Sequence, residues 1–93
     1  MAESDLKINI PEDVLFREVG GEAVILNLES GKYYGLDEVG TRMWALLAEF
    51  GSLEPVLDRL LEEYEVDEGQ LRDDLGELVD KLAEQGLLSV DPP

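Results

Sequence analysis

The stretch that decides the fold is residues 22–50, EAVILNLESGKYYGLDEVGTRMWALLAEF, in which an extended pattern gives way to a helical one. Residues 22–28 are rich in β-branched and large apolar side chains, which predicts a strand. The turn residues 29–32 include Gly31, which is free to take positive φ, and they lead into a short aromatic strand at 33–36. The two strands predict a β-hairpin.

Three helices are predicted after this hairpin, because the apolar period changes from two residues to 3.6 at Asp37. Asp37 is a suitable N-cap for a helix that ends at Gly51, and Ser52 is a suitable N-cap for a second, short amphipathic helix. Asp67 opens the third and longest helix, which carries its leucines on one stripe and ends at Gly86.

The N-terminal part supplies the remaining strand of the expected sheet. Residues 6–10 alternate apolar and polar side chains until Pro11 and predict a first strand, and residues 87–90 predict a final extended piece. We therefore expect an α+β fold of the winged helix-turn-helix type, with a three-stranded antiparallel sheet followed by three helices. Because 93 residues form one small core, a single domain is expected over residues 1–93.

Composition excludes several functions. Seven Lys and Arg against 23 Asp and Glu give a formal net charge of −16, which repels nucleic acid. The sequence has no Cys and no His, so thiol nucleophiles, zinc-cysteine sites and the commonest general base are excluded. With neither an apolar run of membrane-spanning length nor a signal-peptide pattern, the protein is expected in the cytoplasm, without a membrane partner.

The acidic residues and Ser52 are candidates for reactive sites. The pairs Glu62-Glu63 and Asp73-Asp74 diverge on their helices and lack the spacing of a calcium loop, so a solvated face is expected, with no metal or cofactor. Ser52 begins a helix in a small acidic chain, as the phosphopantetheine serine of acyl carrier proteins does. Gly51 stands where those carriers have an acidic residue, so an N-cap explains Ser52 better.

A cleft for a peptide is predicted between the last strand of the hairpin and the third helix. Successive strand side chains face opposite sides, so one of Tyr33 and Tyr34 faces away from the helices, either packed on a neighbouring strand or lining a groove. The apolar stripe of the third helix is wider than one seam, and we expect part of it to be uncovered. If residues 33–36 are a sheet edge, a peptide strand can add there, and the acidic rim favours a basic or mixed-charge peptide.

Residues 24–47, from VILNLESGKYYGLDEVG to TRMWALL, resemble the PqqD-like family. These small winged-helix proteins bind the leader peptides of ribosomally synthesised natural products (RiPPs) and are called RiPP recognition elements. The resemblance covers residues 6–90, and residues 28–44 are most similar to the stand-alone recognition proteins of lasso peptide biosynthesis.

This resemblance implies a non-enzymatic chaperone that binds the leader of a precursor peptide as a strand antiparallel to the third strand and against the third helix. It further implies delivery to a leader peptidase, which is a cysteine protease, with a cyclase acting afterwards. The alternative is a PqqD-type chaperone that presents a precursor peptide to a radical SAM enzyme. The peptide-binding residues expected by position and spacing are Lys32, Tyr33, Tyr34, Gly35, Leu36, Leu71, Asp74, Leu75, Leu78, Val79 and Leu82.

Overall fold

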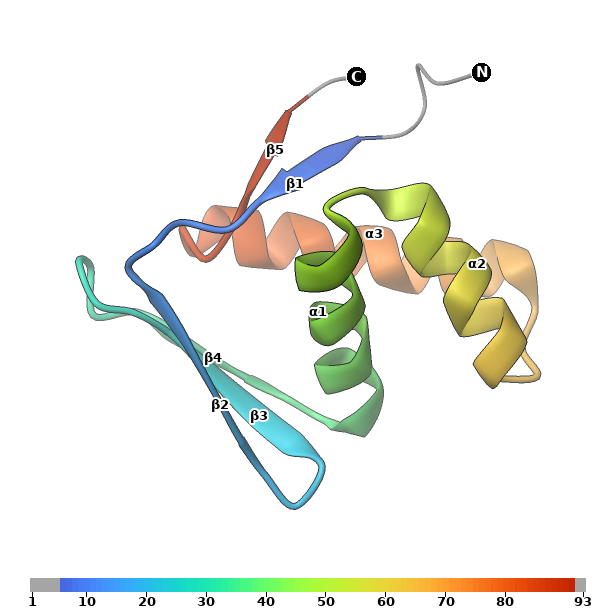
Figure 1. The fold of residues 1–93 in the computed structure, drawn as a ribbon, viewed down its shortest axis with the longest axis horizontal. Coiled ribbons are helices and arrows are strands. Elements are labelled where there is room, and N and C mark those ends of the chain that lie inside the picture. Colours follow the sequence, from blue (N-terminus) through green and yellow to red (C-terminus); the bar gives the residue numbers. More distant parts are fainter. Residues whose placement is uncertain (1–5, 92–93) are drawn as a thin grey trace.

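The computed structural model describes residues 6–91 and shows two small sheets and three helices (Figure 1). The elements in chain order are β1 (Lys7–Asn9), β2 (Val14–Val19), β3 (Glu22–Asn27), β4 (Tyr33–Leu36), α1 (Glu38–Phe50), α2 (Leu53–Glu63), α3 (Glu68–Glu84) and β5 (Ser89–Asp91). Strands β2, β3 and β4 form an antiparallel sheet in that order, so β4 is one of its edges. The predicted α+β, winged-helix-like architecture of a three-stranded sheet followed by three helices is confirmed.

The first strand of the sheet was placed wrongly by the sequence pattern. Residues 6–10 do contain a strand, but β1 pairs with β5 in a separate antiparallel ribbon, and β2 takes the place expected for it. Strand β2 escapes a search for alternation because both of its faces carry apolar side chains. Phe16 stacks on Trp44 with ring centroids 6.4 Å apart, whereas Leu15 and Val19 are exposed on the opposite face.

The helix ends follow the capping residues with one exception. The Asp37 side chain accepts a hydrogen bond from the Gly40 N–H at 2.8 Å, and α1 is closed by Gly51 at a φ of 71°. Asp67 caps α3 in the same way. Helix α2 begins after Ser52 as expected, but the serine side chain makes no capping hydrogen bond.

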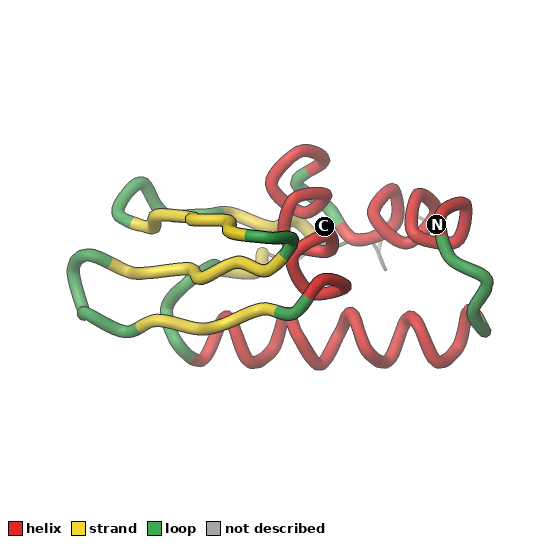
Figure 2. The backbone as a smooth tube through the Cα atoms, turned by 90° about the horizontal axis from the view of Figure 1, so that it is seen from below, coloured by secondary structure: helices red, strands yellow, loops and turns green. Residues whose placement is uncertain are grey.

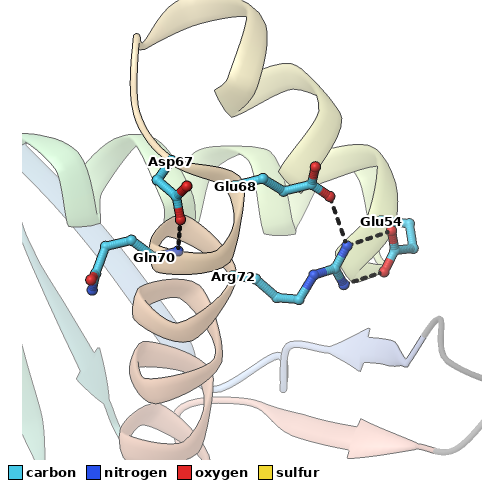
Figure 3. A network of polar contacts seen from close by, with 5 residues as sticks. All are labelled: Glu54, Asp67, Glu68, Gln70 and Arg72. Carbon is cyan, nitrogen blue, oxygen red and sulfur yellow. Dashed lines mark hydrogen bonds and ion pairs between the residues drawn. The ribbon is translucent and has the colours of Figure 1, made fainter.

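One hydrophobic core joins the inner face of the sheet to all three helices. Its fully buried side chains are Ile25, Leu46, Leu47, Val56, Leu57, Leu60, Leu82 and Leu87. At the start of α3, Arg72 forms ion pairs with Glu54 of α2 at 2.8 Å and with Glu68 at 3.4 Å (Figure 3). No helix within residues 6–91 is long and apolar enough to cross a membrane.

A buried asparagine connects the β3–β4 hairpin to the end of α3. The Asn27 side-chain oxygen accepts from the backbone N–H groups of Glu29 and Ser30, at 2.8 and 3.1 Å. Its amide nitrogen donates to the Gly86 carbonyl at 2.7 Å. The same side chain therefore shapes the turn before β4 and holds it against the end of α3, which fixes one end of the space between these two elements.

Candidate peptide-binding groove

A groove with a volume of about 350 Å³ opens between β4 and α3. Figure 2 shows α3 running alongside the sheet, with the strand that leads into α1 nearest to it. The groove is lined by Tyr34, Gly35, Leu36, Asp37, Gly40, Asp74, Glu77, Leu78 and Lys81. The cleft expected between the third strand of the sheet and the third helix is therefore present.

The backbone of β4 leaves hydrogen-bonding groups directed away from the sheet. The Asn27 N–H donates to the Lys32 carbonyl at 2.9 Å, and the register continues with Ile25 opposite Tyr34. In an antiparallel pair the backbone groups alternate in direction from one residue to the next. The N–H and C=O groups of Tyr33 and Gly35 thus point away from β3, and an extended peptide could pair with them.

The apolar part of the groove lies where the two elements meet. Tyr34 and Leu78 are half-buried and pack against the core, and Leu36 is buried beside them. Gly40 allows the start of α1 to lie close to Leu36, since a Cβ at this position would lie 3.2 Å from a methyl carbon of Leu36. The groove therefore offers an apolar contact formed by the buried and half-buried side chains of Leu36, Tyr34 and Leu78.

The rim of the groove is acidic. It carries the carboxylates of Asp37, Asp74 and Glu77 against one ammonium group, that of Lys81. Asp37 is engaged as the cap of α1, and Asp74 accepts a hydrogen bond from Gln70 at 3.0 Å. This charge arrangement favours a peptide with a basic side chain, as the net charge of the sequence suggested.

The structure divides the predicted binding residues into three groups. Tyr34, Gly35, Leu36, Asp74 and Leu78 line the groove. Tyr33 lies on the side of the sheet that faces away from α1 and is 71% exposed, so the expectation that one of the two tyrosines faces away from the helices is confirmed. Lys32 is exposed in the turn before β4 and lines a separate hollow with Asn27 and Gly86.

The third group lies in the core. The side chains of Leu71, Leu75, Val79 and Leu82 are at most 5% exposed and belong to one cluster with α1, α2 and the sheet. The apolar stripe of α3 is therefore covered at these four positions and partly exposed only at Leu78, which lines the groove. The stripe is wide because α3 meets several neighbours on that side, among them α2 and the leucines 87 and 88 that follow the helix.

Sequence reasoning missed four groove residues, which are Asp37, Gly40, Glu77 and Lys81. Two of them, Glu77 and Lys81, had a detectable signal. Glu77 and Leu78 lie three and four residues after Asp74, and Lys81 lies four and three residues after them, which places the four side chains on one face of α3. Glu77 and Lys81 could therefore have been found from Asp74. Asp37 and Gly40 join the groove because α1 starts directly after β4, a placement that only the tertiary structure reveals.

Comparison with known proteins agrees with this geometry. Residues 22–88 match the family model described as coenzyme PQQ synthesis protein D (PqqD). The chain belongs to the PqqD family. No curated protein matches the sequence significantly.

Two solved structures are similar to the chain. One is TbiB1 in complex with the TbiA(beta) leader peptide, with 37% sequence identity, a TM-score of 0.81, and coverage of 87% of this chain and 94% of that chain. The other is a lasso peptide synthetase B1 complexed with the leader peptide, with 24% identity, a TM-score of 0.78, and coverage of 89% and 98%. The second likeness shows the shared fold.

Proposed function

We propose that this protein binds the leader of a ribosomally synthesised precursor peptide, of the lasso peptide class, as a strand antiparallel to β4 and against α3. The observation that carries the proposal is the open edge of β4 beside a groove in which Tyr34, Leu36 and Leu78 offer apolar contacts and charged side chains form the rim. Strand addition to a sheet edge gives affinity through backbone hydrogen bonds, and neighbouring pockets give specificity. The similar protein TbiB1 was solved with a leader peptide, which supports the same use of the fold.

In this proposal the protein is a non-catalytic adaptor that delivers the leader to a separate leader peptidase, a cysteine protease, before a cyclase acts. A sequence without Cys or His lacks the side chains of a thiol nucleophile and of its usual base. A cysteine protease that removes the leader must then be another protein. The acidic rim of the groove also makes a basic leader residue near Asp74 and Glu77 favourable.

The edge used by the leader can be tested with two proline substitutions, because the sheet has two edges. Gly35 on β4 directs its N–H away from β3. Just before β2, the Leu28 N–H donates to the Asp13 carbonyl, so the odd-numbered residues of β2 hydrogen-bond to β3 and the even-numbered Glu18 directs its N–H away from it. Proline removes an N–H donor and is tolerated where that donor faces solvent. Each variant therefore loses one edge donor and keeps the pairing with β3.

Calorimetric titration with the cognate leader separates the two edges. Gly35→Pro should weaken leader binding about tenfold, because the ring removes a donor and obstructs the added strand. Glu18→Pro should bind the leader with wild-type affinity. Equal affinities for both variants, with unchanged circular dichroism, would contradict strand addition at β4.

The alternative function is presentation of a precursor peptide to a radical SAM enzyme. It rests on the description of the matching family model, which is a protein of coenzyme PQQ synthesis. The two functions differ in the precursor and in the partner enzyme. Titration of the protein with a lasso-type leader and with a quinone-cofactor precursor distinguishes them, because the proposal requires clear preference for the first.

A further inference from the structure

The face of the β2–β3–β4 sheet that turns away from α1 carries exposed apolar side chains. We call it the outer face and define it by Leu15, Val19, Val24, Leu26, Tyr33 and Gly35, which share one side of the sheet by register and alternation. Leu15, Val19, Val24 and Tyr33 are 47–75% exposed. Figure 1 shows α1 on one side of this sheet and no described element on the other.

The outer face differs in charge from the rest of the protein. Arg17 and Glu22 are the charged side chains on the same side of the sheet, and their opposite charges cancel, whereas the whole chain carries a formal net charge of −16. Two copies meeting through this face would bring two strongly negative molecules together, which opposes self-association. A different protein with an apolar surface meets no such repulsion at this face, so a heterologous partner is the occupant that the charges favour.

The outer face is continuous with the peptide groove. A hollow of about 610 Å³, lined by Arg17, Val24 and Gly35 among others, shares Gly35, Leu36 and Asp37 with the groove. If a leader adds to β4, the alternation of strand side chains places every second leader residue on the outer face, beside Tyr33 and Gly35. Gly35 has no side chain and a Cβ there would touch nothing within 4 Å, so space is open at this junction.

We infer that the outer face is the docking surface for the leader peptidase, which contacts the protein and the outward side chains of the bound leader together. The inference rests on the proposed function, because the leader completes the surface. A peptidase docked in this way binds the loaded protein more tightly than the free protein. By linkage, it also raises the affinity of the protein for the leader by the same factor.

Two exposed valines provide a matched test. Val24 lies on the outer face and is 47% exposed, and Val66 lies between α2 and α3 and is 49% exposed. Val24→Asp should weaken binding of the purified peptidase to the protein–leader complex at least about tenfold, since it places a charge in an apolar contact. Val66→Asp introduces the same charge and should leave peptidase binding unchanged. Both variants should bind the leader within about twofold of wild type.

A second, milder substitution at the same position tests the contact even if Val24→Asp does not fold. Val24→Thr keeps the β-branched shape that suits a strand and should weaken peptidase binding about threefold while the protein stays folded. Peptidase binding is measured by biolayer interferometry with and without leader, and the oligomeric state by sedimentation velocity.

Several outcomes overturn the inference. Wild-type peptidase affinity in both Val24 variants contradicts docking at the outer face, and equal affinity with and without leader contradicts a shared surface. A wild-type dimer that Val24→Asp dissociates would make the face a self-interface instead. Failure of the wild-type protein to bind any leader is a separate result, because it contradicts the proposed function first.

Discussion

Leu78 and Val79 are adjacent on α3, yet aspartate should mainly weaken leader binding at position 78 and mainly destabilise the fold at position 79. Leu78 is half-buried and lines the groove, whereas Val79 is 3% exposed and belongs to the core. A carboxylate at position 79 would be an unpaired charge in the interior, which costs about 3–5 kcal/mol. A domain of this size has a total stability of about 5–14 kcal/mol, so Val79→Asp should unfold at a temperature roughly 12–40 °C lower.

Leu78→Asp should fold and lose leader binding. Its carboxylate reaches solvent at the groove, so the free energy of unfolding should fall by about 1–2 kcal/mol. The leader loses its apolar contact with Leu78, and an apolar leader side chain would meet a carboxylate in its place, which should weaken binding by more than about 1.4 kcal/mol, or tenfold. Leu61→Asp is a matched control, since Leu61 is half-buried against the core on α2 and lies outside the groove.

The assay combines thermal denaturation by circular dichroism with calorimetric titration of the leader. We expect a large fall in melting temperature for Val79→Asp, and a folded protein without tight binding for Leu78→Asp. If Val79→Asp melts like the wild type, the division of α3 into a core face and a groove face is wrong. If Leu78→Asp binds the leader normally, the groove lies elsewhere on the protein.

Two further predictions concern stability. Asn27→Ala removes three hydrogen bonds and leaves the Gly86 carbonyl without this partner. Urea denaturation should therefore show a free energy of unfolding lower by about 1–3 kcal/mol. A decrease below about 0.5 kcal/mol would contradict the role given to this side chain. The hydrogen bond from Arg42 holds the pKa of Glu63 below its usual value. The stabilisation by this pair is therefore complete above the pKa of an unfolded glutamate and is lost as pH falls through the lower folded-state pKa. Urea denaturation across this range should show a smaller acid-side loss for Glu63→Gln than for the wild type, and equal losses would contradict the assignment.

Periodicity predicted the helices well and the sheet partly. Helices α1, α2 and α3 each have an apolar stripe and a recognisable first residue, so their existence and limits could be inferred from residues 37–86 alone. Strand pairing depends on contacts between distant segments, and alternation within residues 6–10 does not reveal that β1 pairs with β5. Strand β2 was missed because an apolar outer face removes the alternation that identifies a half-buried strand.

The site was predicted better on the strand than on the helix. Residues 33–36 were expected to form an exposed edge because strand order follows the hairpin, and β4 is that edge. On α3, the sequence marks which side chains share a face and does not say what packs against them. Leu75 and Val79 were therefore assigned to an open surface, although the neighbouring helices bury them.

The two faces of α3 predict that the proposed groove tolerates leaders of different sequences. The core face holds α3 in place through Leu75 and Val79, so the groove exists before the peptide arrives and its formation does not consume binding energy. Pairing with the edge of β4 uses the peptide backbone, which every sequence has. Selectivity in the proposed complex then falls to Tyr34, Leu78 and the acidic rim, which together require one apolar side chain and disfavour acidic residues in the leader. Because the groove selects so few side chains, most positions of the leader are free to vary in sequence. The leader side chains on the outer face would instead be selected by the docked peptidase.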